Sequence, residues 1–378
     1  MTILRNNLER DNSDKINNKI NNANKNRQAI HVLSVDDSAV VREMMSCLLP
    51  DANGLTLDVA ADPVIATRKI AQRRPDVILL DLEMPRMDGL SFMRELMAKN
   101  PIPVVICSGY AARGTDIALQ ALSEGAFEIL SKPKQGIADF LEKSVAEFRT
   151  VLREAAKSAR PKSRTAGATL QAVPSRRLAT IPPPDRTSSG QFSVVAIGTS
   201  TGGPTALNDV LGKLTPNCPG IVVVQHMPPN FTAALARRLD WSCQISVREA
   251  LHGDLVAPGT ALIAPGDRHL MLVRRGPHLS VALADGPEVN GHKPSVDVLF
   301  KSVALAAGSR ACGVILTGMG ADGAVGLAVM RAAGATTLGQ SEASCAVYGM
   351  PQRAFELGAI ERVVELCDVA NAIDEDFE

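Results

Sequence analysis

The chain has 378 residues, of which 46% are hydrophobic and 21% charged, and its 40 basic side chains balance 40 acidic ones. This length exceeds what one hydrophobic core usually supports, so we expect two domains with connecting segments. The balanced charge excludes the strongly basic composition typical of nucleic-acid binders, and no apolar run reaches the roughly 18 residues of a membrane-inserted helix.

The N-terminal segment, residues 1–28, is rich in Asn and Lys and almost lacks periodic apolar positions. Such a segment cannot bury enough apolar area to offset its ordering entropy, so we expect a disordered tail. A secretory signal peptide would need an apolar stretch here, and we therefore expect a cytoplasmic protein. The seven cysteines and six histidines form no C-x-x-C pair and no ligand-like cluster, so we expect neither a zinc site nor a redox pair.

Residues 29–150 alternate short apolar runs with amphipathic stretches, which predicts strand–helix units in series. The pairs are HVLSV with AVVREMMSCLL, LTLDVA with VIATRKIAQRR, DVILLDL with LSFMRELMAKN, PVVICS with DIALQALSEG, and EILS with DFLEKSVAEFRTVLREA. Units of this kind predict a doubly wound α/β domain with a parallel sheet.

Residues 151–191 combine Pro, Ser and Gly with many Lys and Arg side chains, which predicts a basic, partly extended linker. A solvated tether is the simpler interpretation, and a contact with an acidic partner is the alternative. Residues 192–378 then resume the alternation, with SVVAIG before TALNDVLGKL, GIVVVQHM before FTAALARRL, and ACGVILTGMG before AVGLAVMRAAG. We expect a second doubly wound, Rossmann-like α/β domain, with its Gly- and Pro-rich middle forming antiparallel hairpins added to the sheet.

Polar residues stand where four strands of the first domain end. Asp36 and Asp37 follow the first strand, Asp81 the third, Ser108 the fourth and Lys132 the fifth. Ligands of open parallel sheets bind at this edge, and three carboxylates can hold a hard cation such as Mg²⁺. Asp81 is then the natural nucleophile toward a phosphodonor. Each residue alone is typical of a turn or a helix cap, so the prediction depends on the set.

The motifs VDDS, LLDLEMPRMDG, CSG and SKP resemble those of response-regulator receiver domains over residues 29–150. The resemblance implies a flavodoxin-like fold in which Asp36, Asp37 and Asp81 bind the metal and Asp81 is phosphorylated. It also implies that Ser108 is the hydroxyl switch and that Lys132 pairs with the phosphoryl group. The alternative is a degenerate receiver that serves as an unphosphorylated interaction module.

Two details of this domain concern the last strand. Ile129 stands where many receivers carry a switch aromatic residue, so we do not expect an aromatic switch here. The dipeptide Lys132-Pro133 suggests a cis peptide bond.

A serine, a histidine and an aspartate follow strands of the second domain. Ser200 lies in the glycine-rich turn GTSTGGP, which by itself fits catalysis and phosphate binding equally well. His226 ends the next strand, and Asp322 follows a later one in GMGADG. Serine needs a base, and an imidazole needs a carboxylate that fixes its tautomer, so together the three predict a catalytic triad. Their order in the chain argues against the common α/β-hydrolase fold.

Four segments, IGTSTGGPTAL, VVQHMPPNFT, HKPSVDVLF and ILTGMGADGAVGL, resemble the catalytic domain of chemotaxis protein-glutamate methylesterases over about residues 192–370. The resemblance implies that Ser200 is the nucleophile, His226 the base and Asp322 the orienting acid. The implied substrates are glutamyl methyl esters, and also glutamine amides, on the cytoplasmic helices of methyl-accepting chemotaxis receptors. It implies a chemotaxis histidine kinase as phosphodonor, no cofactor for the hydrolysis, no nucleic-acid partner and no direct membrane insertion.

Further positions around the triad are predicted to bind the substrate or its oxyanion. The backbone amides of Thr201 and Met319 are the candidates for the oxyanion hole. The segment HKPS, residues 292–295, either lines the substrate groove or is an ordinary helix start capped by Ser295. We expect three other polar residues to be surface or turn residues rather than catalytic ones: Asp240, His252 and His269.

Two other functions remain open at this point: an esterase for a small ester, and a receiver-linked module that binds a nucleotide or a protein through the Gly198–Gly203 loop. The domain order also motivates a hypothesis about regulation. In it, the unphosphorylated receiver packs across the sheet edge that bears Ser200 and Asp322, and phosphorylation of Asp81 loosens that contact.

Overall fold

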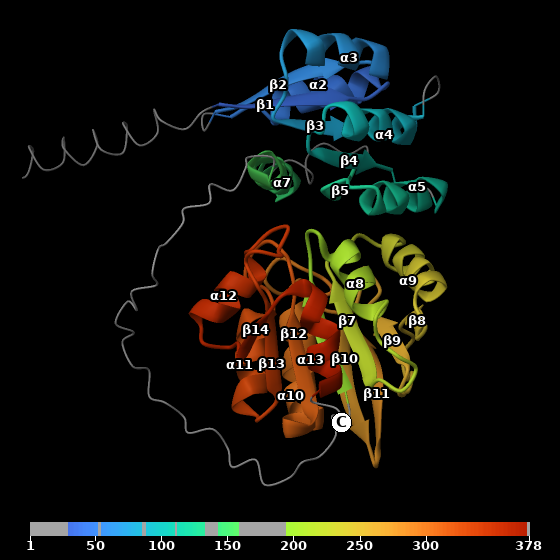
Figure 1. Ribbon diagram of the computed structural model, residues 1–378, viewed down its shortest axis with the longest axis vertical. Coiled ribbons are helices and arrows are strands. Elements are labelled where there is room, and N and C mark those ends of the chain that lie inside the picture. The colour runs from blue at the N-terminus through green and yellow to red at the C-terminus, as the bar shows by residue number, and fades with distance from the viewer. Residues whose placement is uncertain are drawn as a thin grey trace, which may run out of the picture. The chain divides into compact units, whose positions relative to one another are not determined.

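The computed structural model (Figure 1) describes residues 29–51, 54–84, 88–109, 112–132, 143–158 and 194–375, which form two α/β units, each built on its own main β-sheet. The expected tail and residues 159–191 of the expected linker lie outside the described residues. No helix in the described ranges combines the length and apolar composition needed to cross a bilayer.

The first unit is built on a five-stranded sheet in the order β2-β1-β3-β4-β5, the flavodoxin-like order predicted for it. Neighbouring strands run parallel where β1 meets β2 and β3, and where β3 meets β4. The strands are β1 Ile30–Val35, β2 Leu55–Ala60, β3 Val77–Leu80, β4 Val104–Ser108 and β5 Glu128–Ser131. The helices are α2 Ala39–Leu48, α3 Pro63–Gln72, α4 Gly89–Lys99, α5 Ala112–Ser123 and α7 Lys143–Ser158.

Local sequence explains where these helices begin and end. Asp62 and Asp88 accept backbone N–H groups as N-caps of α3 and α4. The predicted amphipathic stretch ends at Ala155, and α7 continues to Ser158, so the helix extends past the expected domain boundary at residue 150. The reason is burial, since this last stretch of α7 still contributes apolar side chains to the core: Val151, Leu152, Ala155 and Ala156.

The second unit is built on a seven-stranded sheet in the order β14-β13-β12-β6-β7-β9-β8. Every pair of neighbouring strands in it is parallel. The strands are β6 Val194–Thr199, β7 Gly220–Gln225, β8 Ser246–Glu249, β9 Thr260–Ile263, β12 Ala311–Ile315, β13 Thr336–Gln340 and β14 Arg362–Val364. The helices are α8 Gly203–Leu211, α9 Phe231–Ser242, α10 Val296–Ala307, α11 Ala324–Ala332, α12 Met350–Glu356 and α13 Val369–Glu375.

The middle of this unit is only partly as expected. An antiparallel hairpin does form, from β10 His269–Arg275 and β11 His278–Ala284, but it is a separate two-stranded sheet that packs beside α10. The expectation that hairpins extend the main sheet is therefore wrong. β9, from the same Gly- and Pro-rich stretch, is instead a parallel strand between β7 and β8. The hairpin stays separate because its apolar face packs with α10 in one core cluster that includes Leu272, Val281 and Phe300.

Strand order creates a switch point in each sheet. In the first sheet, the chain leaves β1 for β2 on one side and continues from β3 on the other. In the second sheet, β6 lies between β7 and β12, so the chain leaves β6 for β7 on one side and later continues from β12 to β13 and β14 on the other. Crevices outside the carboxyl ends of strands at such points are where open α/β sheets bind ligands.

Candidate functional site

At the switch point of the first sheet, the predicted acidic residues and the lysine come together. Asp36 follows β1, Asp81 follows β3 and Lys132 follows β5. The Lys132 Nζ lies 2.9 Å from Asp36 Oδ2 and 2.7 Å from Asp81 Oδ2. One carboxylate oxygen from each of Asp36, Asp37 and Asp81 lies within 4.8 Å of the others. Three hard oxygen donors of this kind suit a divalent cation such as Mg²⁺.

The charges of this cluster depend on one another. Asp81 is 1% exposed, and burial raises the pKa of its carboxyl, although the hydrogen bond and charge of Lys132 offset part of that rise. Burial lowers the pKa of Lys132, but hydrogen bonds to Asp81 and Asp36 outweigh burial and raise it to about 12. Lys132 therefore stays cationic beside the carboxylates, where it can balance an anionic group.

The remaining receiver positions are placed as follows. Ser108 is the buried last residue of β4, and its carbonyl accepts the Lys132 N–H at 2.8 Å. Ile129 is buried within β5. A side chain at Gly89 would lie 2.4 Å from the Asp81 carbonyl oxygen, so α4 approaches this loop closely only because Gly89 has none. The predicted cis bond before Pro133 lies outside the described residues.

Ser200 occupies the turn between β6 and α8 at the switch point of the second sheet. Its N–H donates to the Thr317 carbonyl at 3.0 Å, and its carbonyl accepts from Gln225 Nε2 at 2.9 Å. Gly202 takes φ 76°, in the left-handed region that glycine tolerates. A side chain at Gly203 would meet Gln225 Oε1, so small residues let α8 begin directly behind the serine.

Strand register brings the histidine beside the serine. Thr199 pairs with Gln225 in parallel β6 and β7, so Ser200 and His226 are the next residues on neighbouring strands. The His226 N–H donates to the Thr199 carbonyl at 3.1 Å. Parallel neighbours lie roughly 4.8 Å apart, which places the two residues within side-chain reach.

The histidine ring is linked to Asp322, as predicted. His226 Nε2 lies 2.9 Å from Asp322 Oδ2. The other ring nitrogen, Nδ1, is buried and has no hydrogen-bond partner among the described residues. Nδ1 is therefore the ring nitrogen that is available for a further hydrogen bond. Within the described part of the chain, no hydrogen bond joins it to Ser200 Oγ, and such bonds are often long without substrate and shorten in the reactive complex.

Asp322 is 1% exposed and precedes α11 in the chain. Its carboxylate lies against the first N–H groups of α10, where the helix dipole favours an anion. Burial raises the pKa of its carboxyl, but the hydrogen bond and charge of His226, with further donors, hold it well below its usual range. The carboxylate accepts from five donors: His226 Nε2, Asn290 Nδ2, Ser295 Oγ and the N–H groups of Val296 and Asp297.

The candidate oxyanion donors are the backbone amides of Thr201 and Met319. Thr201 directly follows Ser200, and a side chain at Gly318 would lie 2.8 Å from the Ser200 Cβ, so Gly318, the residue before Met319, packs against the serine. Neither the Thr201 nor the Met319 amide donates a hydrogen bond to another described residue. Both amides therefore remain candidates for the oxyanion hole.

Several residues of the site were missed or misjudged from the sequence. Ser295 does not cap α10 with its side chain, since the hydroxyl donates to Asp322 Oδ1 instead. Asn290 and Gln225 were missed, because an Asn in a turn and a Gln ending a strand carry no local signal of their partners. His269 is 4% exposed and accepts the Ser295 N–H, so the expectation of a surface or turn residue is wrong for it.

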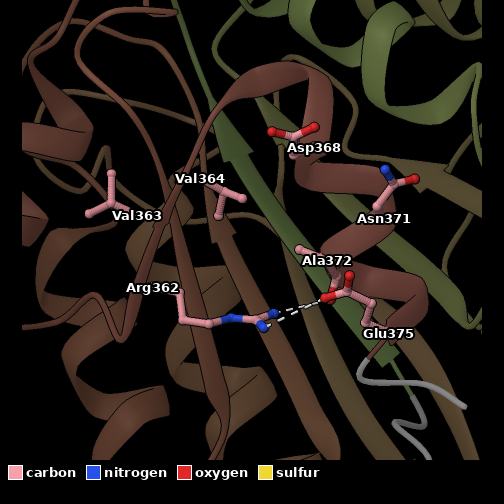
Figure 2. Close-up of a pocket in the computed structure, with 7 residues that line it drawn as sticks. All are labelled: Arg362, Val363, Val364, Asp368, Asn371, Ala372 and Glu375. Atoms are coloured by element: carbon pink, nitrogen blue, oxygen red, sulfur yellow. Dashed lines mark hydrogen bonds and ion pairs between the residues drawn. The ribbon is translucent and has the colours of Figure 1, made fainter.

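A separate pocket (Figure 2) lies between edge strand β14 and α13. Arg362 reaches across it, and one guanidinium N–H donates to the Ala372 carbonyl at 3.2 Å. Asp368, Asn371 and Glu375 complete its polar lining. None of the predicted catalytic residues lines this pocket.

Comparison with known proteins gives a consistent result for both units. Residues 195–373 match the CheB methylesterase family and residues 32–147 the response regulator receiver domain. A "protein-glutamate methylesterase/protein-glutamine glutaminase of group 3 operon" from Rhodopseudomonas palustris is 48% identical over 350 residues, covering 92% of this chain and 96% of the relative. A "protein-glutamate methylesterase/protein-glutamine glutaminase 2" from Pseudomonas syringae pv. tomato is 49% identical, covering 91% and 98%. The crystal structure of the Thermotoga maritima CheB methylesterase catalytic domain is 38% identical, covering 50% of this chain and 99% of that one, with a TM-score of 0.48.

Proposed function

The chain belongs to the family of protein-glutamate methylesterases/protein-glutamine glutaminases that carry a receiver domain, and on this basis we propose how its residues perform the reaction. The enzyme is a phosphorylation-regulated hydrolase that demethylates glutamate methyl esters and deamidates glutamines in chemotaxis. Its substrates under this proposal are side chains of methyl-accepting chemotaxis receptors, and it acts in the cytoplasm.

In the proposed reaction, Ser200 Oγ attacks the side-chain carbonyl of the substrate while His226 Nδ1 takes its proton. Asp322 holds Nε2, so the ring presents Nδ1 toward the serine and the imidazolium is stabilised. Collapse of the tetrahedral intermediate breaks the bond to the leaving group, which departs with the proton from His226 as methanol or ammonia. Water then attacks the acyl-enzyme with the same base, and Ser200 is released with the carboxylic acid product.

The oxyanion of each tetrahedral intermediate would be bound by the amides of Thr201 and Met319. Thr201 directly follows the serine, Gly318 packs against its Cβ, and neither the Thr201 nor the Met319 amide has a hydrogen-bond partner among the described residues. Donors fixed by the backbone before reaction stabilise the developing charge without reorganisation, and losing one typically costs on the order of 100-fold or more in rate.

The observation that carries this proposal is the buried Asp322 carboxylate, which accepts five hydrogen bonds and holds His226 at 2.9 Å. A phosphate-binding loop or a small binding module would explain the turn at Ser200. Neither would require the hydrogen bond between His226 and Asp322 or the further donors to Asp322. No observation favours an esterase for small esters over the family's reaction.

The test is methanol release from methylated cytoplasmic fragments of chemoreceptors. Ser200→Ala should reduce release to background, and Ser246→Ala, at an exposed position that starts β8, should leave it unchanged. Full activity of Ser200→Ala, together with tight nucleotide binding, would support the binding module and contradict the triad.

For the first unit, we propose that Asp81 accepts a phosphoryl group from a chemotaxis histidine kinase. Asp36, Asp37 and Asp81 would hold Mg²⁺, whose charge would offset that of the phosphoryl group. Lys132 would pair with a phosphoryl oxygen, and Ser108 would act as the hydroxyl switch that responds to phosphorylation of Asp81.

We further propose that the unphosphorylated receiver inhibits the hydrolase. Deleting residues 1–190 should then raise methanol release above that of the unphosphorylated full chain, and an equal or lower rate would contradict the inhibition.

A further inference from the structure

His292 has a contact that the triad alone does not explain. Its ring stacks on the ring of His226, with centroids 3.7 Å apart and an interplanar angle of 8°. Face-to-face proximity at this distance fixes the plane of one ring relative to the other. His292 is therefore in direct contact with the proposed base, though it contributes no hydrogen bond to it among the described residues.

The backbone around His292 is held firmly. Its N–H and carbonyl exchange two hydrogen bonds of 3.0 Å with Val289, in an isolated bridge. The same segment continues into Ser295 and Val296, which donate to Asp322. One short stretch of chain thus holds both groups that contact the His226 ring, the carboxylate at its edge and the second imidazole at its face.

A single hydrogen bond to Asp322 leaves the His226 ring free to tilt, and a ring flip would exchange its two nitrogens. We propose that His292 is a positioning residue for His226, whose stacked ring keeps Nε2 on Asp322 and Nδ1 toward Ser200. The proposal deepens the function assigned above and rests on it. His292 contacts the face of the His226 ring, so its effect passes through His226.

The charge state of His292 suits this role. Burial, and next the charge of His226, lower its pKa to about 4, although Asp322 and Glu288 act in the opposite direction. His292 is therefore neutral at neutral pH. A neutral ring can remain stacked when His226 becomes an imidazolium during the attack, whereas a second cation at this distance would oppose that step.

The test compares two replacements in the full chain, with a phosphodonor present. His292→Phe keeps a flat ring at the stacking face, and His292→Leu keeps apolar bulk without one. His278→Leu, at an exposed histidine that starts β11, is the control. We expect His292→Leu to lower kcat by roughly 10- to 100-fold with KM within about twofold, because small misplacements of a catalytic group cost this much. His292→Phe should stay within about threefold of the wild type, as the control should.

Nitrogen-15 spectra of the His226 ring give a measurement independent of turnover. The wild type and His292→Phe should show one tautomer, and His292→Leu a mixture of the two. An unchanged kcat for His292→Leu, a raised KM with unchanged kcat, or equal losses in both variants with one tautomer retained would each overturn the proposal. If Ser200→Ala kept full hydrolysis, the proposed function would fail instead, while the ring spectra would still test the stacking.

Discussion

Replacing Asp322 with asparagine should abolish most hydrolysis while leaving the fold in place. Asp322 Oδ1 accepts from Asn290, Ser295 and the Asp297 N–H, whereas Oδ2 accepts from His226 and the Val296 N–H. An amide nitrogen cannot accept a hydrogen bond. Whichever oxygen it replaces, it faces at least two donors, and the carboxylate charge that stabilises the His226 imidazolium is lost.

These contacts set the expected losses of stability and of activity. Leaving buried donors unsatisfied should lower the free energy of unfolding by about 2 to 4 kcal/mol. A domain whose free energy of unfolding is roughly 5 to 15 kcal/mol stays folded after such a loss. Loss of the orienting carboxylate typically lowers kcat by about 10³- to 10⁴-fold in serine hydrolases with a triad. KM should change little, because Asp322 is buried behind His226.

The assay is methanol release from methylated receptor fragments, with unfolding in urea measured on the same preparations. Asp240→Asn is a matched control, because Asp240 accepts one backbone N–H, from Val247 at 2.7 Å, and lies outside the triad. It should leave kcat within about twofold. An Asp322→Asn enzyme that is folded and keeps kcat within about tenfold of wild type would refute the assignment of Asp322 as the orienting acid.

Three further predictions concern pH, packing and regulation. Because the pKa of Asp322 is lowered in the folded protein, its charge contributes stability above the ordinary carboxyl pKa, and that contribution is lost as pH falls. The difference in the free energy of urea unfolding between wild type and Asp322→Asn should therefore shrink from about pH 7 to about pH 3, and a constant difference would contradict the shift. Gly318→Ala should lower kcat by on the order of 10-fold or more, because the new Cβ would lie 2.8 Å from that of Ser200; Gly286→Ala, where a Cβ meets only ordinary contacts, should not. Asp81→Asn, or chelation of Mg²⁺, should remove the stimulation of methanol release by a small phosphodonor while leaving basal release intact, and stimulation that survives both would rule out Asp81 as the acceptor.

Much of both sites could be predicted because the chemistry of parallel sheets is concentrated at strand ends. Asp36, Asp81 and Lys132 each follow a short apolar run, and the structure joins them through ion pairs of 2.9 and 2.7 Å. Ser200 and His226 follow two such runs in succession, and parallel pairing of β6 with β7 brings them together. Periodicity identifies the strands, and the shared direction of the strands places their ends at one edge.

The sequence alone therefore determined the α/β class, the strand ends and the residue types gathered there. It did not determine how the β10–β11 hairpin is placed, because its alternating pattern fits any sheet with one buried face, and packing against α10 decided the outcome. It also did not show that Asn290 and Ser295 hold Asp322, or that His292 stacks on His226. These contacts join segments distant in the chain. Only the tertiary fold, which places the start of α10 against the loop after β12, decided which atoms surround the His226 ring and left its Nδ1 without a partner among the described residues.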